Sequence, residues 1–292
     1  MVKKSQKLSL VVVYALLAAL VYAVLGLVVK FSTTKLPNEM IVFFRQVFSL
    51  ITLLPMVARE QSQGKSLTTN RTHLHLLRAT ASLAAMYSLF YALKYLPVVD
   101  ALVLSYTRPL FIPLVVWLWL GKKMSGKVWW GLAVGFLGVL TVLRPDAQIF
   151  QWSMIAGLLS GAFGAIAVVS VRKLTKTDSP TKIIFYYLVI SLPIAAVPVL
   201  FSWQMPTPFM WGILLIVGIL ATFYQSFLTC AYQHGHTSKV ASVLYSTVIF
   251  ALAFDWFIYD QVIGLLSLLG IGLICVGCLL VVSDKNAAQP IK

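Results

Sequence analysis

The chain alternates between long apolar stretches and short polar connections that contain Pro, Gly, Lys or Asn, residues that end helices. The apolar runs lie at about 8–29, 39–58, 74–93, 98–120, 127–143, 152–171, 182–201, 209–232, 238–259 and 262–282. A helix rises about 1.5 Å per residue, so about twenty residues cross a hydrocarbon core of about 30 Å. The pattern predicts an all-α integral membrane protein with ten transmembrane helices.

The run from Val98 to Leu120 differs from the others because polar residues and prolines interrupt its middle. Arg108 and Pro109 fall near the expected bilayer midplane, where a charge is costly. Proline cannot donate a backbone hydrogen bond, so Pro109 should free the carbonyl of Ser105, and Pro113 that of Pro109. A broken, charged helix at this depth is tolerated where it faces protein or water, which favours a transport site.

Composition also favours a membrane protein, because 60% of the residues are hydrophobic and only 11% are charged, against about 25% charged in soluble domains. The first apolar run is too long for a cleaved signal peptide and is interpreted as a transmembrane helix. The cysteines, Cys230, Cys275 and Cys278, all lie in apolar runs and indicate no disulfide framework. The CxxC spacing of the last two favours packed thiols over a redox or metal site.

The net charge of +15 is distributed as membrane topology predicts, which favours a bilayer over nucleic acid as the partner. With both termini in the cytoplasm, the inner side holds 17 of the 23 Lys and Arg residues. These are Lys3, Lys4, Lys7, Arg59, Lys65, Arg71, Arg78, Lys122, Lys123, Lys127, Arg172, Lys173, Lys176, Lys182, Lys239, Lys285 and Lys292. We therefore expect a multi-pass protein of the inner (plasma) membrane with cytoplasmic N- and C-termini.

The two halves of the chain repeat each other. A shift of 139 positions lays residues 92–143 on 231–282 without gaps, and it aligns Tyr106 with Tyr245 and Gly138 with Gly277. An earlier shift of 143 aligns Pro37 with Pro180. The expected domains are 1–145 and 146–292, each with five helices, and an odd number inverts the second half in the membrane. Inverted repeats place a substrate site at their interface.

Each half closes with a Tyr-containing helix, a short turn and a Gly-rich helix. The clearer segment runs from Tyr106-Thr107-Arg108-Pro109-Leu110-Phe111 through Leu120-Gly121-Lys122 to Gly131, Gly138 and Leu140; its counterpart runs from Tyr245 through Asp255-Trp256 to Asp260, Gly270 and Gly277. The whole chain thereby resembles the drug/metabolite transporter superfamily, specifically its EamA-type members. Lys122 stands where the family usually has an acidic residue, and Val248 stands where Pro109 would recur.

The resemblance implies a secondary transporter, often a metabolite or amino-acid exporter. It also implies that the fifth and tenth helices are largely scaffold and that the other helices line a central cavity. No nucleophile triad, paired catalytic carboxylates or nucleotide-binding loop is present in the sequence, so we expect neither an enzyme nor a cofactor.

Arg108 is the first candidate for substrate contact. On a helix it shares a face with Ser105, and the strip Ala101, Ser105, Arg108 and Ile112 should look into the cavity. A guanidinium there is suited to hold a carboxylate or phosphate. The alternative is an internal ion pair with a remote acid.

Asp255 and Arg45 should lie at similar depths near the outer ends of their helices. A pair of opposite charges costs less in the membrane than two lone charges, so we expect them to pair. Three uses compete: a structural bridge, an outer gate that opens in each cycle, and a proton site that couples transport to protons.

Aromatic and polar side chains of the expected cavity helices complete the candidate site. They are Tyr14, Tyr22, Tyr87, Tyr91, Tyr106, Phe223, Tyr224, Tyr245, Gln225 and Thr229. Aromatic walls with polar tips suit an amphipathic or ring-bearing solute, although lipid-facing or packed aromatics are the commoner case. We expect transport of a small polar metabolite, with an anionic, carboxylate-bearing solute such as an amino acid favoured; the alternative is a nucleotide derivative or an S-adenosylmethionine-like metabolite.

Overall fold

The computed structural model describes residues 2–64, 66–121, 125–143, 152–234, 240, 243–244, 246–260 and 264–283. The described residues are helical, with short connections and no strand. The helices are α1 (Val2–Thr33), α2 (Asn38–Ser62), α3 (Thr72–Tyr95), α4 (Val98–Ser105), α5 (Arg108–Leu120), α6 (Gly126–Leu143), α7 (Trp152–Leu174), α8 (Pro180–Val199), α9 (Pro208–His234), α11 (Ser246–Tyr259) and α12 (Leu265–Ser283).

Local sequence explains several helix ends. Ser179 caps α8 by accepting a hydrogen bond from the backbone N–H of Lys182, and Pro180 follows at the first helical position, where it needs no donor. Gly121 ends α5 in the left-handed region at φ 62°, a conformation that costs glycine little. The predicted interruption near Pro109 is also present, because α4 ends at Ser105 and α5 begins at Arg108.

Seven segments of the described chain are long and apolar enough to span a membrane, and one of them joins α4 and α5 as Val98–Trp119. Three shorter apolar helices lie at Gly126–Thr141, Ser246–Tyr259 and Leu268–Leu280. Apolar side chains cover much of the exposed surface, such as Leu118 and Phe257, which are 76% and 74% exposed. This surface suits lipid, and the total of ten membrane crossings stays a prediction.

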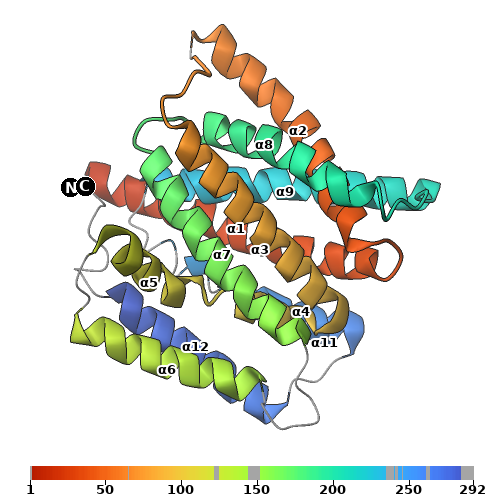
Figure 1. The fold of residues 1–292 in the computed structure, drawn as a ribbon. Coiled ribbons are helices and arrows are strands. Elements are labelled where there is room, and N and C mark those ends of the chain that lie inside the picture. Colours follow the sequence, from red (N-terminus) through yellow and green to blue (C-terminus); the bar gives the residue numbers. More distant parts are fainter. Residues whose placement is uncertain are drawn as a thin grey trace.

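The helices pack in pairs drawn from the two halves of the chain. Helix α3 runs beside α7, α1 packs along α9, and α6 pairs with α12 below the other helices in the view of Figure 1. The α6–α12 pair is very close: a Cβ on Gly138 would lie 2.6 Å from the backbone nitrogen of Ile274. The glycines at the repeat-related positions 138 and 277 therefore allow close helix packing.

The repeat alignment predicts the boundaries of the later helices. Moving α5 and α6 by 139 positions gives 247–259 and 265–282, each within one residue of α11 and α12. The register of the repeat is therefore present in the structure. The inverted orientation of the two halves in a membrane stays a prediction.

Candidate functional site

The break between α4 and α5 positions Arg108. Pro109 has no N–H for the carbonyl of Ser105, and that carbonyl instead accepts a hydrogen bond from Nε of Arg108 at 3.1 Å. The hydroxyl of Thr107 also donates to a backbone carbonyl three residues earlier, that of Leu104, at 2.6 Å. The guanidinium is therefore anchored to the backbone that the proline leaves unpaired.

The remaining contacts of Arg108 are hydroxyl groups. Nη2 donates to the hydroxyl oxygen of Tyr22 at 2.8 Å and to that of Ser105 at 2.9 Å, and Nη1 donates to the hydroxyl of Tyr224 at 3.3 Å. These are neutral acceptors, and no described acidic side chain forms an ion pair with this arginine. The positive charge of Arg108 is thus oriented without being neutralised.

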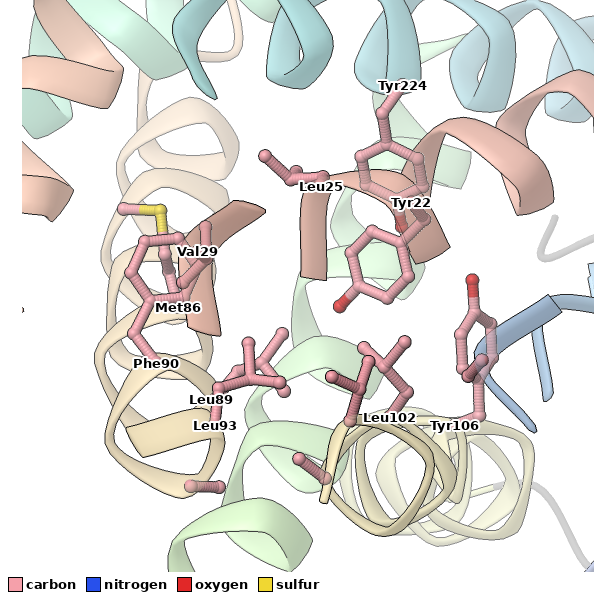
Figure 2. Close-up of a cluster of buried hydrophobic side chains, with 14 of the residues drawn as sticks. Tyr22, Leu25, Val29, Met86, Leu89, Phe90, Leu93, Leu102, Tyr106 and Tyr224 are labelled. Atoms are coloured by element: carbon pink, nitrogen blue, oxygen red, sulfur yellow. The ribbon is translucent and has the colours of Figure 1, made fainter. Parts of the chain in front are cut away.

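Three tyrosines surround the guanidinium. Tyr22 of α1 stacks on Tyr224 of α9 with ring centres 4.4 Å apart, and it meets Tyr106 edge-on at 5.5 Å. Figure 2 shows Tyr22 between the other two rings. Tyr106 is 4% exposed, and its hydroxyl accepts a hydrogen bond from Thr247. Tyr106 therefore packs against Tyr22 without lining the cavity described below, whereas Tyr22 and Tyr224 both line that cavity.

The cavity contains about 740 Å³ of space free of atoms, part of it open to solvent. Its lining comes from α1, α2, α3, α5, α7, α8 and α9. No described residue of α6 or α12 lines it, and the scaffold role of these helices stays an expectation. Of the predicted strip along α4 and α5, only Arg108 reaches the cavity; Ser105 acts by holding it.

Arg45 also lines this cavity and is 4% exposed. Its Nη1 donates to the side-chain oxygen of Gln46 at 2.9 Å and to the hydroxyl of Tyr187 at 3.1 Å. Gln46 in turn donates to Tyr187 and to Ser191. Arg45 is therefore held between α2 and α8.

Asp255 lies elsewhere, so the structure does not bring the expected Arg45–Asp255 pair together. The carboxylate is fully buried and accepts hydrogen bonds from the backbone N–H groups of Val98, at 3.1 Å, and Val99, at 2.6 Å. These are the first residues of α4, whose preceding Pro97 supplies no side-chain cap. Asp255 thus caps α4 from α11, where the helix dipole also favours a negative charge.

Arg78 is a cavity residue that the sequence analysis does not single out, because it counts Arg78 among the cations of the inner side. It lies in the second turn of α3, is 2% exposed and lines the cavity. Its guanidinium carbon lies 4.6 Å from the ring centre of Tyr187, and Nη2 approaches the side-chain oxygen of Gln225 at 3.4 Å. In the sequence, Arg78 differs from the loop cations because it lies inside the apolar run 74–93.

The other predicted site residues fall into three groups. Gln225 and Thr229 line the cavity with Tyr224, whereas Tyr87 and Tyr91 do not. Tyr91 is 40% exposed and contacts Tyr95. Tyr245 lies outside the described residues. The substrate-contact roles of all these residues remain predictions.

The acidic residues of the described chain are absent from the cavity lining. Asp178 bonds His75 at 3.1 Å and Lys182 at 3.3 Å, and Glu60 accepts hydrogen bonds from the hydroxyls of Ser179 and Thr181. These contacts lie where α2 and α7 end and α3 and α8 begin. No group of three or more His, Cys, Asp and Glu side chains within the described ranges is arranged to hold a metal.

Two segments of the chain, residues 9–144 and 151–283, match the model of the EamA-like transporter family. The two matches together cover most of the chain.

Relatives of the chain are metabolite transporters. The chain is 31% identical to the pseudopaline exporter CntI of Pseudomonas aeruginosa strain UCBPP-PA14, over 94% of this chain and 96% of that protein. It is 27% identical to an S-adenosylmethionine uptake transporter of Rickettsia bellii, over 88% of each chain. It is 28% identical to a riboflavin transporter of Brucella anthropi, over 73% of this chain and 77% of the relative.

A crystal structure of a protein with 16% sequence identity has the same fold, with a TM-score of 0.65, over 93% of this chain and 96% of that chain. The family and the relatives are transporters rather than enzymes. Together with the apolar helices, these matches identify an integral multi-pass membrane protein that transports small molecules. The chain therefore belongs to the EamA-like transporter family.

Proposed function

We propose that this protein is a secondary active transporter of a small carboxylate-bearing metabolite, such as an amino acid or a related solute. The observation that supports this most directly is Arg108, which lines the central cavity and whose partners among the described residues are hydroxyl and carbonyl groups rather than acids. A guanidinium has five N–H donors, and four hydrogen bonds hold Arg108, so donor capacity remains for a substrate oxygen.

Alternating access is the mechanism that fits this arrangement. Two five-helix units, residues 1–145 and 146–292, contribute helices to one cavity, and rocking of one bundle against the other would open it to each side in turn. The asymmetry of Lys and Arg supports an inner (plasma) membrane location with both termini in the cytoplasm. Asp255 is fully buried beside the first residues of α4. Movement of the start of α4 away from α11 would expose its carboxylate to protons.

A nucleotide derivative or an S-adenosylmethionine-like metabolite is the second candidate. The names of relatives that move S-adenosylmethionine and riboflavin favour it, as do the tyrosines at the cavity wall. S-adenosylmethionine carries a positively charged sulfonium group. The three arginines of the cavity lining, and the absence of described acidic residues from it, disfavour such a cation. Like charges brought together in a medium of low dielectric constant repel strongly.

Thermal stabilisation of the detergent-solubilised protein tests the proposal, because a ligand that binds the native state raises its apparent melting temperature. The panel contains amino acids, organic acids, nucleotide derivatives, S-adenosylmethionine and riboflavin. We expect stabilisation by a carboxylate in the wild type and its loss in Arg108→Gln, with Arg59→Gln, an exposed arginine, as the matched control. Stabilisation that is unchanged in Arg108→Gln would remove Arg108 from substrate binding.

A further inference from the structure

A second pair of arginines lies in the same cavity as Arg108. Arg45 of α2 and Arg78 of α3 are 4% and 2% exposed, and both contact Tyr187 of α8. Arg45 donates to the tyrosine hydroxyl at 3.1 Å, while the guanidinium carbon of Arg78 lies 4.6 Å from the centre of the ring. One tyrosine therefore keeps two buried positive charges beside each other.

The two guanidiniums have more hydrogen-bond donors than partners. Together they have ten N–H groups, and they form four hydrogen bonds to other described residues. Both bonds of Arg78, to the carbonyl of Ile183 and to Gln225, are 3.4 Å long, beyond the usual range for N–H donors. The Nε atoms of Arg45 and Arg78 are buried and have no partner. Donors remain available on a pair of groups that face a cavity.

The charges of Arg45 and Arg78 are equally uncompensated. No described acidic side chain forms an ion pair with either one, and none lines the cavity. Buried charges are costly unless they are paired, and two of the same sign also repel each other. An anion placed between them would satisfy the free donors and reduce the repulsion in one step.

This pair lies close to the Arg108 site along α9. Tyr224 accepts a hydrogen bond from Arg108, and the next residue, Gln225, accepts one from Arg78. Consecutive Cα atoms are about 3.8 Å apart, and both side chains line the same cavity. Apolar side chains that include Met86, Leu89 and Leu228 form another part of the wall.

From this geometry we propose that Arg45 and Arg78 form a second anion subsite, and that the substrate carries at least two anionic groups, as a dicarboxylate or polycarboxylate does. One group binds Arg108, another binds the Arg45–Arg78 pair, and the apolar part of the solute lies against the aliphatic wall. This inference rests on the proposed function and narrows its substrate class from carboxylates to compounds with two or more of them.

The test compares straight-chain dicarboxylates of four to eight carbons with monocarboxylates of equal carbon number, so that adipate is matched with hexanoate. Dissociation constants come from the concentration dependence of thermal stabilisation at pH 7. In the wild type we expect the best dicarboxylate to bind at least about tenfold more tightly than its matched monocarboxylate, a gain of about 1.4 kcal/mol. Arg45→Gln and Arg78→Gln should lower that ratio to about one, whereas Arg59→Gln should retain it.

The outcomes separate this inference from the proposed function. If monocarboxylates bind through Arg108 and the matched dicarboxylates bind no more tightly, the second subsite is wrong and the proposed function stands. If no acid of either series, nor any amino acid, stabilises the wild type, the proposed function fails as well. A wild-type ratio near one refutes the second subsite even if both arginine variants fail to fold. A high ratio that persists in folded Arg45→Gln and Arg78→Gln would also refute the second subsite.

Discussion

At the scale of single residues, the position of Arg108 depends on a glycine in the neighbouring helix. A Cβ on Gly164 of α7 would lie 2.7 Å from Nε and 2.8 Å from Cδ of Arg108, closer than side chains tolerate. In Gly164→Ala the arginine side chain must therefore move, and it is the more flexible partner. We expect the dissociation constant of a carboxylate ligand to rise about tenfold, equal to about 1.4 kcal/mol, without a large change in the melting temperature of the unliganded protein.

Gly157→Ala on the same helix is the matched control, because the new Cβ would meet Leu104 at 3.0 Å rather than Arg108. It should affect packing and leave carboxylate affinity close to the wild-type value. Wild-type affinity in Gly164→Ala would show that the observed position of Arg108 is not required for binding.

Asp255 provides a second test at the residue scale. Because it caps α4 while Arg45 bonds Gln46 and Tyr187, the two residues share no partner. A double-mutant cycle of Arg45→Gln and Asp255→Asn should give a coupling energy within about 0.5 kcal/mol of zero in thermal or chemical unfolding. A coupling above about 1 kcal/mol would restore the ion pair that the sequence suggested.

The role of Asp255 in proton coupling is a separate question with its own measurement. If the carboxylate acts only as a cap, Asp255→Asn keeps an acceptor oxygen for α4, and the pH dependence of transport should remain. Asp255→Ala should be less stable by about 1 kcal/mol, because both N–H groups at the start of α4 lose their acceptor. Loss of the pH dependence in a folded, transporting Asp255→Asn would instead identify Asp255 as the coupling acid.

At the scale of the helices, the α4–α5 break is needed because it leaves a carbonyl for Arg108. In Pro109→Ala the new N–H competes with Arg108 for the carbonyl of Ser105. We expect unchanged or higher thermal stability together with weaker carboxylate binding. Pro113→Ala in the same helix is the control, since the carbonyl that it would pair belongs to residue 109 and does not hold Arg108. Equal affinity in Pro109→Ala and the wild type would contradict this account of the break.

The sequence predicted much of this level of organisation. Apolar length and Pro and Gly signals located the helices, and the repeat register of 139 placed α11 and α12 within one residue. It also predicted the break at Pro109 and the free carbonyl of Ser105. Partners across the structure were less predictable: equal depth suggested Arg45 for Asp255, but depth along helices does not fix which faces meet.

Arg78 shows that sequence position alone does not predict which cations line the cavity. Counting Lys and Arg residues at helix ends placed it with the loop cations, although it lies within an apolar run. A long side chain near a helix end often reaches the interface, so sequence alone does not separate that case from a cavity residue. The contact with Tyr187, which lies 109 residues later in the chain, makes the distinction.

At the scale of the whole molecule, the orientation in the membrane can be measured directly. Replacing Gln63, exposed just after α2, with cysteine should allow labelling by a membrane-impermeant thiol reagent from the cytoplasmic side only. Thr34→Cys, in the exposed turn between α1 and α2, should react from the opposite side. Both are made in a background in which Cys230, Cys275 and Cys278 are serine. A reversed labelling pattern would overturn the predicted orientation.

Arg108 is proposed to bind the anionic group of a transported solute. The most direct measurement is counterflow of a radiolabelled carboxylate into proteoliposomes preloaded with the same unlabelled acid, with wild type, Arg108→Gln and Arg59→Gln reconstituted at equal density. We expect accumulation with the wild type and Arg59→Gln and a loss of at least about tenfold with Arg108→Gln, the size of effect expected when a charge-assisted hydrogen bond is removed. Accumulation by Arg108→Gln at the wild-type rate and concentration dependence would show that Arg108 does not bind the solute.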